Sequence, residues 1–242
     1  MIVSIHQPEH LPWLGFFDKL RQADVFVLLD TTQYAKDDFQ NRNRIKTANG
    51  PSWLTVPVYK KGKSEQLILE AEISYDSKWQ NKSWQLILQS YKNSPYFSEH
   101  RSFFEDIYKT KVIKLVDLNI KIIKYVVQQL GIRSKIVTAS ELKIFEKGST
   151  TVNLKICEIL NAETYLSGKM GKQYLDIQQF EERGISIEYQ DFSHPIYPQQ
   201  WGEFIPNMSI IDLLFNCGPS GLEIIAEANS QKEKQFLETS EK

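Results

Sequence analysis

The chain has little cysteine, and this scarcity excludes several kinds of protein at once. Only Cys157 and Cys217 occur among its 242 residues. Neither belongs to a CxxC pair or to a Cys/His cluster, so we expect no structural zinc site. A chain of this length can bury a large core without a disulfide or a metal. The cysteine content therefore favours a cytoplasmic protein.

Excess charge and long apolar runs are also missing. The formal net charge of −1 gives no electrostatic reason to expect a nucleic-acid partner, because phosphate binding usually requires a basic face. No stretch approaches the roughly 18 apolar residues of a membrane span, and the N-terminus has no secretory signal segment. The composition, 41% apolar and 24% charged, is that of an ordinary globular protein. We expect it to act on a small molecule.

The apolar segments predict an α/β fold. The β-branched residues at 2–5 predict a short buried strand, the aromatic residues after Pro12 follow helical spacing, and residues 24–30 predict a second buried strand. Strands and helices continue to alternate toward the C-terminus, with predicted strands at 136–139, 163–166 and 185–189 and helices at 150–160, 173–183 and 210–215. This alternation is typical of a Rossmann-like parallel sheet flanked by helices.

Helical periodicity dominates residues 77–130, which we predict to be a mainly helical insertion. Before it, residues 31–50 are polar and predict a loop, and 53–58 predict an edge strand at best, because Pro57 cannot donate to a sheet. Other local predictions are a turn at 60–63, a cap for the 210–215 helix from Asn207 or Ser209, and a turn at 217–221. The sequence thus predicts one α/β domain, 1–228, and a polar tail at 229–242.

Two histidines follow the first predicted strand in a proline-rich loop. Ligands of open parallel sheets bind beyond the carboxyl ends of the strands. A histidine there can donate to phosphate oxygens or stabilise charge on a leaving group. We therefore predict catalytic roles for His6 and His10, with Gln7 as a ligand-binding neighbour. The alternative is that His6 only satisfies backbone groups and His10 is exposed.

A second candidate loop, 167–172, follows a later predicted strand. Gly168 and Gly171 let a ligand approach the main chain, and lysines add positive charge. The spacing matches neither a Walker A motif nor a dinucleotide fingerprint. We predict that Ser167, Gly168, Gly171 and Lys172 contact a phosphate or carboxylate; alternatively, the glycines serve only the turn.

The third candidate is a polar cluster at 40–46, in which two arginines alternate with asparagines. Forked guanidinium donors suit phosphate and carboxylate groups. We predict ligand contacts from Arg42, Asn43 and Arg44. The alternative is an ordinary solvated loop.

Several motifs, in order from residue 2 to about 220, resemble the WbqC-like protein family. They are HQP at 6–8, LPW at 11–13, QNRNRI at 40–45, WLTVP at 53–57, YLSG at 165–168, YLD at 174–176 and LLFNCG at 213–218. Members of that family are typically encoded near genes for cell-surface polysaccharides such as O-antigen and for unusual amino sugars, and transfer of an amino acid to a sugar amine has been proposed. Position 10 is often aromatic there, which implies a secondary role for His10.

The opening is also similar to nucleotidyltransferase-type enzymes such as pantothenate synthetase. Those enzymes bind ATP with a pair of histidines, although the spacing of His6 and His10 differs from their HxGH. The likeness implies that ATP, with Mg²⁺ where required, would activate a carboxylate by adenylation before an amine attacks it.

Together, the resemblances imply a transferase or an ATP-dependent ligase that forms an amide, for example a glycyl amide, on a nucleotide-linked amino sugar. The alternative is a non-catalytic protein that binds a nucleotide sugar or holds a polysaccharide-assembly complex together. Geometry separates the two, because an enzyme needs His6, Arg42 and Ser167 around one pocket.

Overall fold

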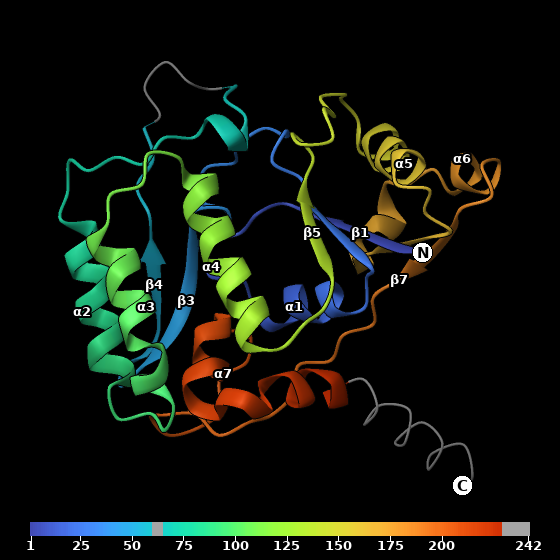
Figure 1. The fold of residues 1–242 in the computed structure, drawn as a ribbon. Coiled ribbons are helices and arrows are strands. Elements are labelled where there is room, and N and C mark those ends of the chain that lie inside the picture. Colours follow the sequence, from blue (N-terminus) through green and yellow to red (C-terminus); the bar gives the residue numbers. More distant parts are fainter. Residues whose placement is uncertain (60–64, 229–242) are drawn as a thin grey trace, which may run out of the picture.

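A five-stranded sheet forms the centre of the computed structural model, which describes residues 1–59 and 65–228 (Figure 1). Its strands, in spatial order, are β5 (Lys135–Thr138), β2 (Val25–Leu28), β1 (Ile2–His6), β6 (Thr164–Ser167) and β7 (Ser186–Tyr189). Every neighbouring pair is parallel. The predicted Rossmann-like α/β fold is confirmed.

Helices cover both faces of this sheet, because alternate residues of each buried strand face opposite sides. In β2, Phe26 and Leu28 pack in one core with α1 (Leu14–Arg21). Val25 and Val27 pack in a second core with α5 (Ser149–Ile159).

The segment between β2 and β5 contains the predicted helical insertion, which is also confirmed. It consists of α2 (Trp79–Tyr91), α3 (Phe97–Lys109) and α4 (Leu115–Gln129), preceded by the short 3-10 helix η1 (Ile68–Glu70). Across the described ranges, 1–59 and 65–228, no helix has the length and apolar content needed to cross a membrane.

A hairpin before these helices corrects one prediction. Residues 31–50 were predicted to be a loop, yet β3 (Arg42–Thr47) pairs antiparallel with β4 (Gly50–Thr55). Polar residues occupy both faces of β3 and conceal its alternation, because Asn43 and Lys46 are as fully buried as Ile45. Tertiary contacts, rather than hydrophobic periodicity, make this segment a strand.

The predicted helix at 173–183 is also corrected. The chain forms the 3-10 helix η2 (Lys169–Gln173) and the short helix α6 (Ile177–Glu181). Between them, Thr150 of α5 donates through Oγ1 to the Tyr174 carbonyl (3.3 Å) and accepts from the Asp176 N–H (3.1 Å). These bonds hold the intervening residues outside a helix.

At the C-terminal side, α7 (Ile210–Cys217) is capped by Ser209, whose hydroxyl accepts from the Ile211 N–H. The predicted turn at 217–221 is instead the 3-10 helix η3 (Gly218–Ser220), and 221–228 are helical. The turn predicted at 60–63 and the tail at 229–242 lie outside the described residues.

A buried carboxyl group joins the insertion, the hairpin and the C-terminal helix. Asp212 of α7 accepts from the hydroxyls of Tyr91 (2.6 Å) and Tyr197 (3.0 Å). The Tyr91 oxygen in turn accepts from the Lys46 N–H of β3 (3.0 Å). Burial raises the pKa of Asp212, so these donors supply the hydrogen bonds that water no longer provides.

We expect Tyr91→Phe to lower the free energy of unfolding by about 1–3 kcal/mol, since it orphans the Lys46 N–H and removes a donor from Asp212. Chemical denaturation of the purified variant measures this change. Tyr96→Phe is the matched control, because the Tyr96 hydroxyl has no hydrogen bond within the described part of the chain. An equal effect of the two substitutions would contradict the assigned role.

Candidate functional site

A cavity of about 1240 Å³ opens at the carboxyl edge of the sheet. The carboxyl ends of all five strands contribute to its wall: His6, the last residue of β1, with Gln7, then Thr31 after β2, 145–149 after β5, Gly168 after β6 and Gln190 after β7. From β1 the chain crosses to β2 on one side, and β6 pairs with β1 on the other. Ligands of open α/β sheets bind at this switch point in strand order.

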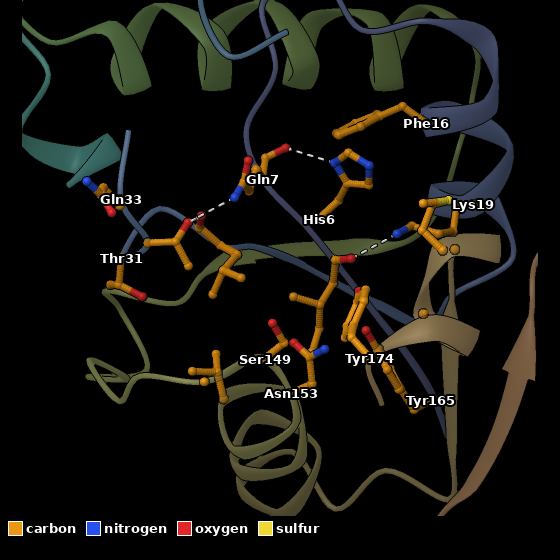
Figure 2. A pocket seen from close by; sticks show the side chains of 18 of the residues that line it. His6, Gln7, Phe16, Lys19, Thr31, Gln33, Ser149, Asn153, Tyr165 and Tyr174 are labelled. Atoms are coloured by element: carbon orange, nitrogen blue, oxygen red, sulfur yellow. Dashed lines mark hydrogen bonds between the residues drawn. The ribbon is translucent and has the colours of Figure 1, made fainter. Parts of the chain in front are cut away.

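Lys19 projects from α1 into the cavity wall, as Figure 2 shows. Its side chain is buried, and Nζ donates to the carbonyl of Ile5 at 2.8 Å. Burial lowers the pKa of Lys19 to about 7, against an opposing effect of the Glu9 carboxylate. A substantial fraction of this amine is therefore unprotonated at neutral pH.

His6 lies at the end of β1, edge-on to the ring of Phe16 at a centroid distance of 5.1 Å. Its Nδ1 is 3.0 Å from the carbonyl of Gln7. Since a carbonyl only accepts, Nδ1 carries the proton and Nε2 is left as an acceptor. Burial, with a smaller effect of Lys19, lowers the pKa of His6 to about 3. The imidazole is thus neutral, and the predicted donation to phosphate is corrected to an acceptor role.

A buried carboxyl group lies beside this pair. Burial and then Asp38 raise the pKa of Glu9 to about 8, while Lys19 opposes the shift. Within the described part of the chain, Glu9 Oε2 has no hydrogen-bond partner. Glu9 Oε1 is 3.8 Å from His6 Nδ1, and Glu9 is not among the residues that line the cavity.

Gln7 lines the cavity with its amide held on two sides. Nε2 donates to Thr32 Oγ1 at 3.2 Å, and Oε1 accepts from Gln40 Nε2 at 2.7 Å. Gln40 also accepts from the Ala35 N–H at 2.9 Å. The side chain of Gln7 is therefore fixed in the wall.

His10 is outside the cavity, contrary to the expectation that it accompanies His6. It is completely buried, with Nδ1 3.1 Å from Asn119 Oδ1 in α4. Asn119 Nδ2 donates to the carbonyls of Pro8 and Gln40. Burial lowers the pKa of His10 to about 4. These contacts give His10 a structural role in joining the first loop to the insertion.

The arginine cluster is also outside the cavity. Arg42 donates to the Asp37 carbonyl and lies 4.4 Å from the Trp53 ring, and Arg44 lies 5.6 Å from the same ring. Asn43 is buried and donates to the carbonyl of Leu11 at 2.8 Å. His6, Arg42 and Ser167 consequently do not surround one pocket.

Only part of the loop at 167–172 lines the cavity. Gly168 and Gly171 line the cavity. A Cβ on Gly171 would lie 2.1 Å from Ser167 Oγ, so glycine is needed there for packing. Ser167 is itself buried, and Lys172 Nζ lies 5.0 Å from the Tyr189 ring, outside the wall.

Sequence reasoning missed Lys19 and Asn153, which both line the cavity. A signal for Lys19 was available, because it follows Phe16 by three residues and so falls on the apolar side of the predicted helix. Asn153 lies on the buried side of α5, next to Val152. In residues 1–59 and 65–228, no group of three His, Cys, Asp or Glu side chains is placed to hold a metal ion.

The sequence pattern of the WbqC-like protein family matches residues 7–224. The chain belongs to this family. It is also 34% identical over 218 residues to Rv1507c of Mycobacterium tuberculosis (strain ATCC 25618 / H37Rv), an uncharacterized protein; the alignment covers 89% of this chain and 94% of the relative. No solved structure matches the chain. The WbqC-like match includes every cavity loop from Gln7 onward.

The low pKa of Lys19 predicts how stability depends on pH. Between pH 8 and 10 the folded amine is neutral, whereas the unfolded amine, with a pKa near 10.5, binds a proton. Stability contributed by this site therefore rises with pH, by roughly 1.4 kcal/mol per pH unit. We expect the difference in free energy of unfolding, wild type minus Lys19→Met, to increase with pH at this rate.

Urea denaturation at pH 9, 9.5 and 10 measures the difference, at pH values above the pKa of about 8 for Glu9. Lys172→Met, the same substitution at an exposed lysine outside the cavity wall, is the control to which the slope is compared. A slope for Lys19→Met no steeper than that of the control would show that Lys19 has an ordinary pKa.

Proposed function

We propose that this WbqC-like protein is an enzyme that forms an amide on the amino group of a nucleotide-linked amino sugar, with an acyl group such as glycyl as the donated part. One observation supports this proposal most. A single cavity is lined by Lys19, a buried lysine whose pKa is lowered to about 7, and by His6, a neutral imidazole (Figure 2). An attacking amine must lose a proton, and a general base works best with a pKa near the operating pH. Lys19 meets that condition.

The volume of the cavity supports two substrates. Sites for one drug-sized ligand usually span about 300–1,000 Å³. At about 1240 Å³, this cavity has room for a nucleotide sugar and an acyl donor together. A reaction between them gains from being held side by side.

In the proposed reaction, the amino nitrogen of the sugar attacks the acyl carbon. A C–N bond forms, the bond from that carbon to the leaving group breaks, and the leaving group departs with the bonding electron pair. The proton of the amine passes to Lys19 Nζ. His6 Nε2 accepts a hydrogen bond from the second amine N–H and so orients the nitrogen lone pair.

ATP is the proposed source of the leaving group, bound as its Mg²⁺ complex. Adenylation of the donor carboxylate would make AMP that leaving group. This step rests on the likeness of the first strand and loop to nucleotidyltransferase-type enzymes. A transferase that receives an already activated acyl group would use Lys19 and His6 in the same way.

A non-catalytic protein could leave His6, Arg42 and Ser167 scattered, and Arg42 and Ser167 do lie outside the cavity wall that contains His6. The case for an enzyme therefore rests on Lys19 rather than on those three residues. Burying a lysine next to a carbonyl, without a hydrogen-bonded carboxylate, destabilises its charged form. Simple recognition of a nucleotide sugar gains nothing from a neutral amine. Proton transfer does, and perturbed groups of this kind concentrate at catalytic sites.

The test incubates the protein with ATP, Mg²⁺, glycine and a UDP-linked amino sugar, and detects AMP or ADP by chromatography and the amide by mass spectrometry. We expect Lys19→Met, which removes the proposed base, to lower kcat by about 10²–10⁴-fold. His6→Ala, which removes only an orienting acceptor, should lower kcat by a smaller factor, with a melting temperature near that of the wild type. His194→Ala is the matched control and should keep turnover within a few-fold, because His194 Nδ1 also contacts the carbonyl of the next residue (2.9 Å) but His194 lies outside the cavity.

Two results would contradict parts of this proposal. If ATP does not bind and neither AMP nor ADP appears, the ligase version is wrong. If His6→Ala instead lowers the melting temperature strongly, His6 is a structural residue.

A further inference from the structure

The N-terminus of α5 is open toward the cavity. Gly148, at the N-cap, has a φ of +93° and no side chain to cap the helix. The first helical bond runs from the Val152 N–H to the Gly148 carbonyl (3.0 Å), which leaves the N–H groups of 149–151 without helical acceptors. Gly148 and Ser149 both line the cavity. Such a helix end carries partial positive charge and suits an anion.

A second observation, independent of the helix end, points to a ligand at the same place. Asn153 follows Ser149 by one helical turn, is 5% exposed and projects into the cavity (Figure 2). Its side chain has no hydrogen bond to any residue within 1–59 or 65–228. This amide faces the cavity, where a bound acceptor can take its N–H groups in place of water.

The charged side chains that line the cavity are of both signs, Asp38, Glu65 and Glu146 against Lys147 and Lys169, so the case for an anion rests on the helix end and Asn153. The first turn of α5 contains no acidic residue. Lys147, which precedes Gly148, lines the cavity. Glu146 lines it too, but its carboxylate accepts the Phe145 N–H at 2.9 Å.

We infer that this end of the cavity is a phosphate subsite, in which the N–H groups of 149–151, the Ser149 hydroxyl and the Asn153 amide bind the di- or triphosphate of a nucleotide. The inference rests on the proposed function for the identity of the nucleotide, since both the nucleotide sugar and ATP carry this chemistry. Its donors are all uncharged, and they come from the wall formed by α5.

Calorimetric titration of the full chain with UDP, ATP and inorganic pyrophosphate, each with Mg²⁺, tests the subsite. Ser149→Asp is the decisive variant, because an aspartate in the first turn favours the helix and repels phosphate. We expect it to weaken binding at least tenfold without lowering the melting temperature. Ser98→Asp, the same change in the first turn of α3 and outside the cavity, should leave binding unchanged.

Asn153→Ala should weaken the binding of the same ligands about tenfold. Asn81→Ala, on the exposed side of α2, is the control and should leave their binding unchanged. If only the binding of UDP is weakened, the subsite belongs to the nucleotide sugar. If only the binding of ATP is weakened, it belongs to ATP. Unchanged affinities in both cavity variants, or no binding of any of the three ligands to the wild type, overturn the inference.

These titrations separate the subsite from the proposed reaction. If no amide forms but Ser149→Asp abolishes UDP binding, the subsite stands and the amide-forming function fails. If the amide forms and both variants bind UDP and ATP as the wild type does, the function stands and the subsite is wrong.

Discussion

The position of β1 between β2 and β6 is the constraint on which the rest of the structure depends. Backbone pairing on both edges forces the chain to leave β1 toward one side and return beside it from the other. The two connecting layers lie on opposite faces, α1 with the Phe26 side of the sheet and α5 with the Val27 side. Neither layer covers the carboxyl edge between them, and the cavity opens there.

This arrangement accounts for the unusual state of Lys19. The helix α1 packs its apolar side on the sheet, so a lysine on that side is drawn out of water together with Phe16 and Leu20. Its Nζ donates a hydrogen bond to the carbonyl of Ile5, near the end of β1. A carbonyl stabilises an ammonium less than a hydrogen-bonded carboxylate does, and the pKa falls. The fold thus places an amine of lowered pKa at the proposed site.

The sequence predicted the elements whose apolar residues repeat, and missed those held by long-range polar contacts. The buried strands and the helices of the insertion follow from periodicity alone. In β3, Arg42, Asn43 and Arg44 conceal a strand that depends on pairing with β4. Such contacts are invisible in a local window of sequence.

The same limit applies to the candidate site. His6 and His10 share one loop, and nothing local distinguishes them. Their environments differ because Asn119, 109 residues from His10, binds one of them, while Lys19 and the open cavity meet the other. Asn153 enters the wall only because β6 and β1 are neighbours. Loop positions at strand ends were predictable, whereas the side chains that share a cavity were not.

The proposed phosphate subsite and the proposed base, Lys19, must be kept apart within one cavity. A unit negative charge about 4 Å from Lys19 would stabilise the ammonium by about 4 kcal/mol at an effective dielectric constant near 20, or about three pKa units. An amine so perturbed would no longer accept a proton near pH 7. Phosphate therefore has to bind away from α1, through donors that carry no full charge. The N-terminus of α5 and Asn153 provide such donors on the wall that α5 forms, whereas Lys19 projects from α1.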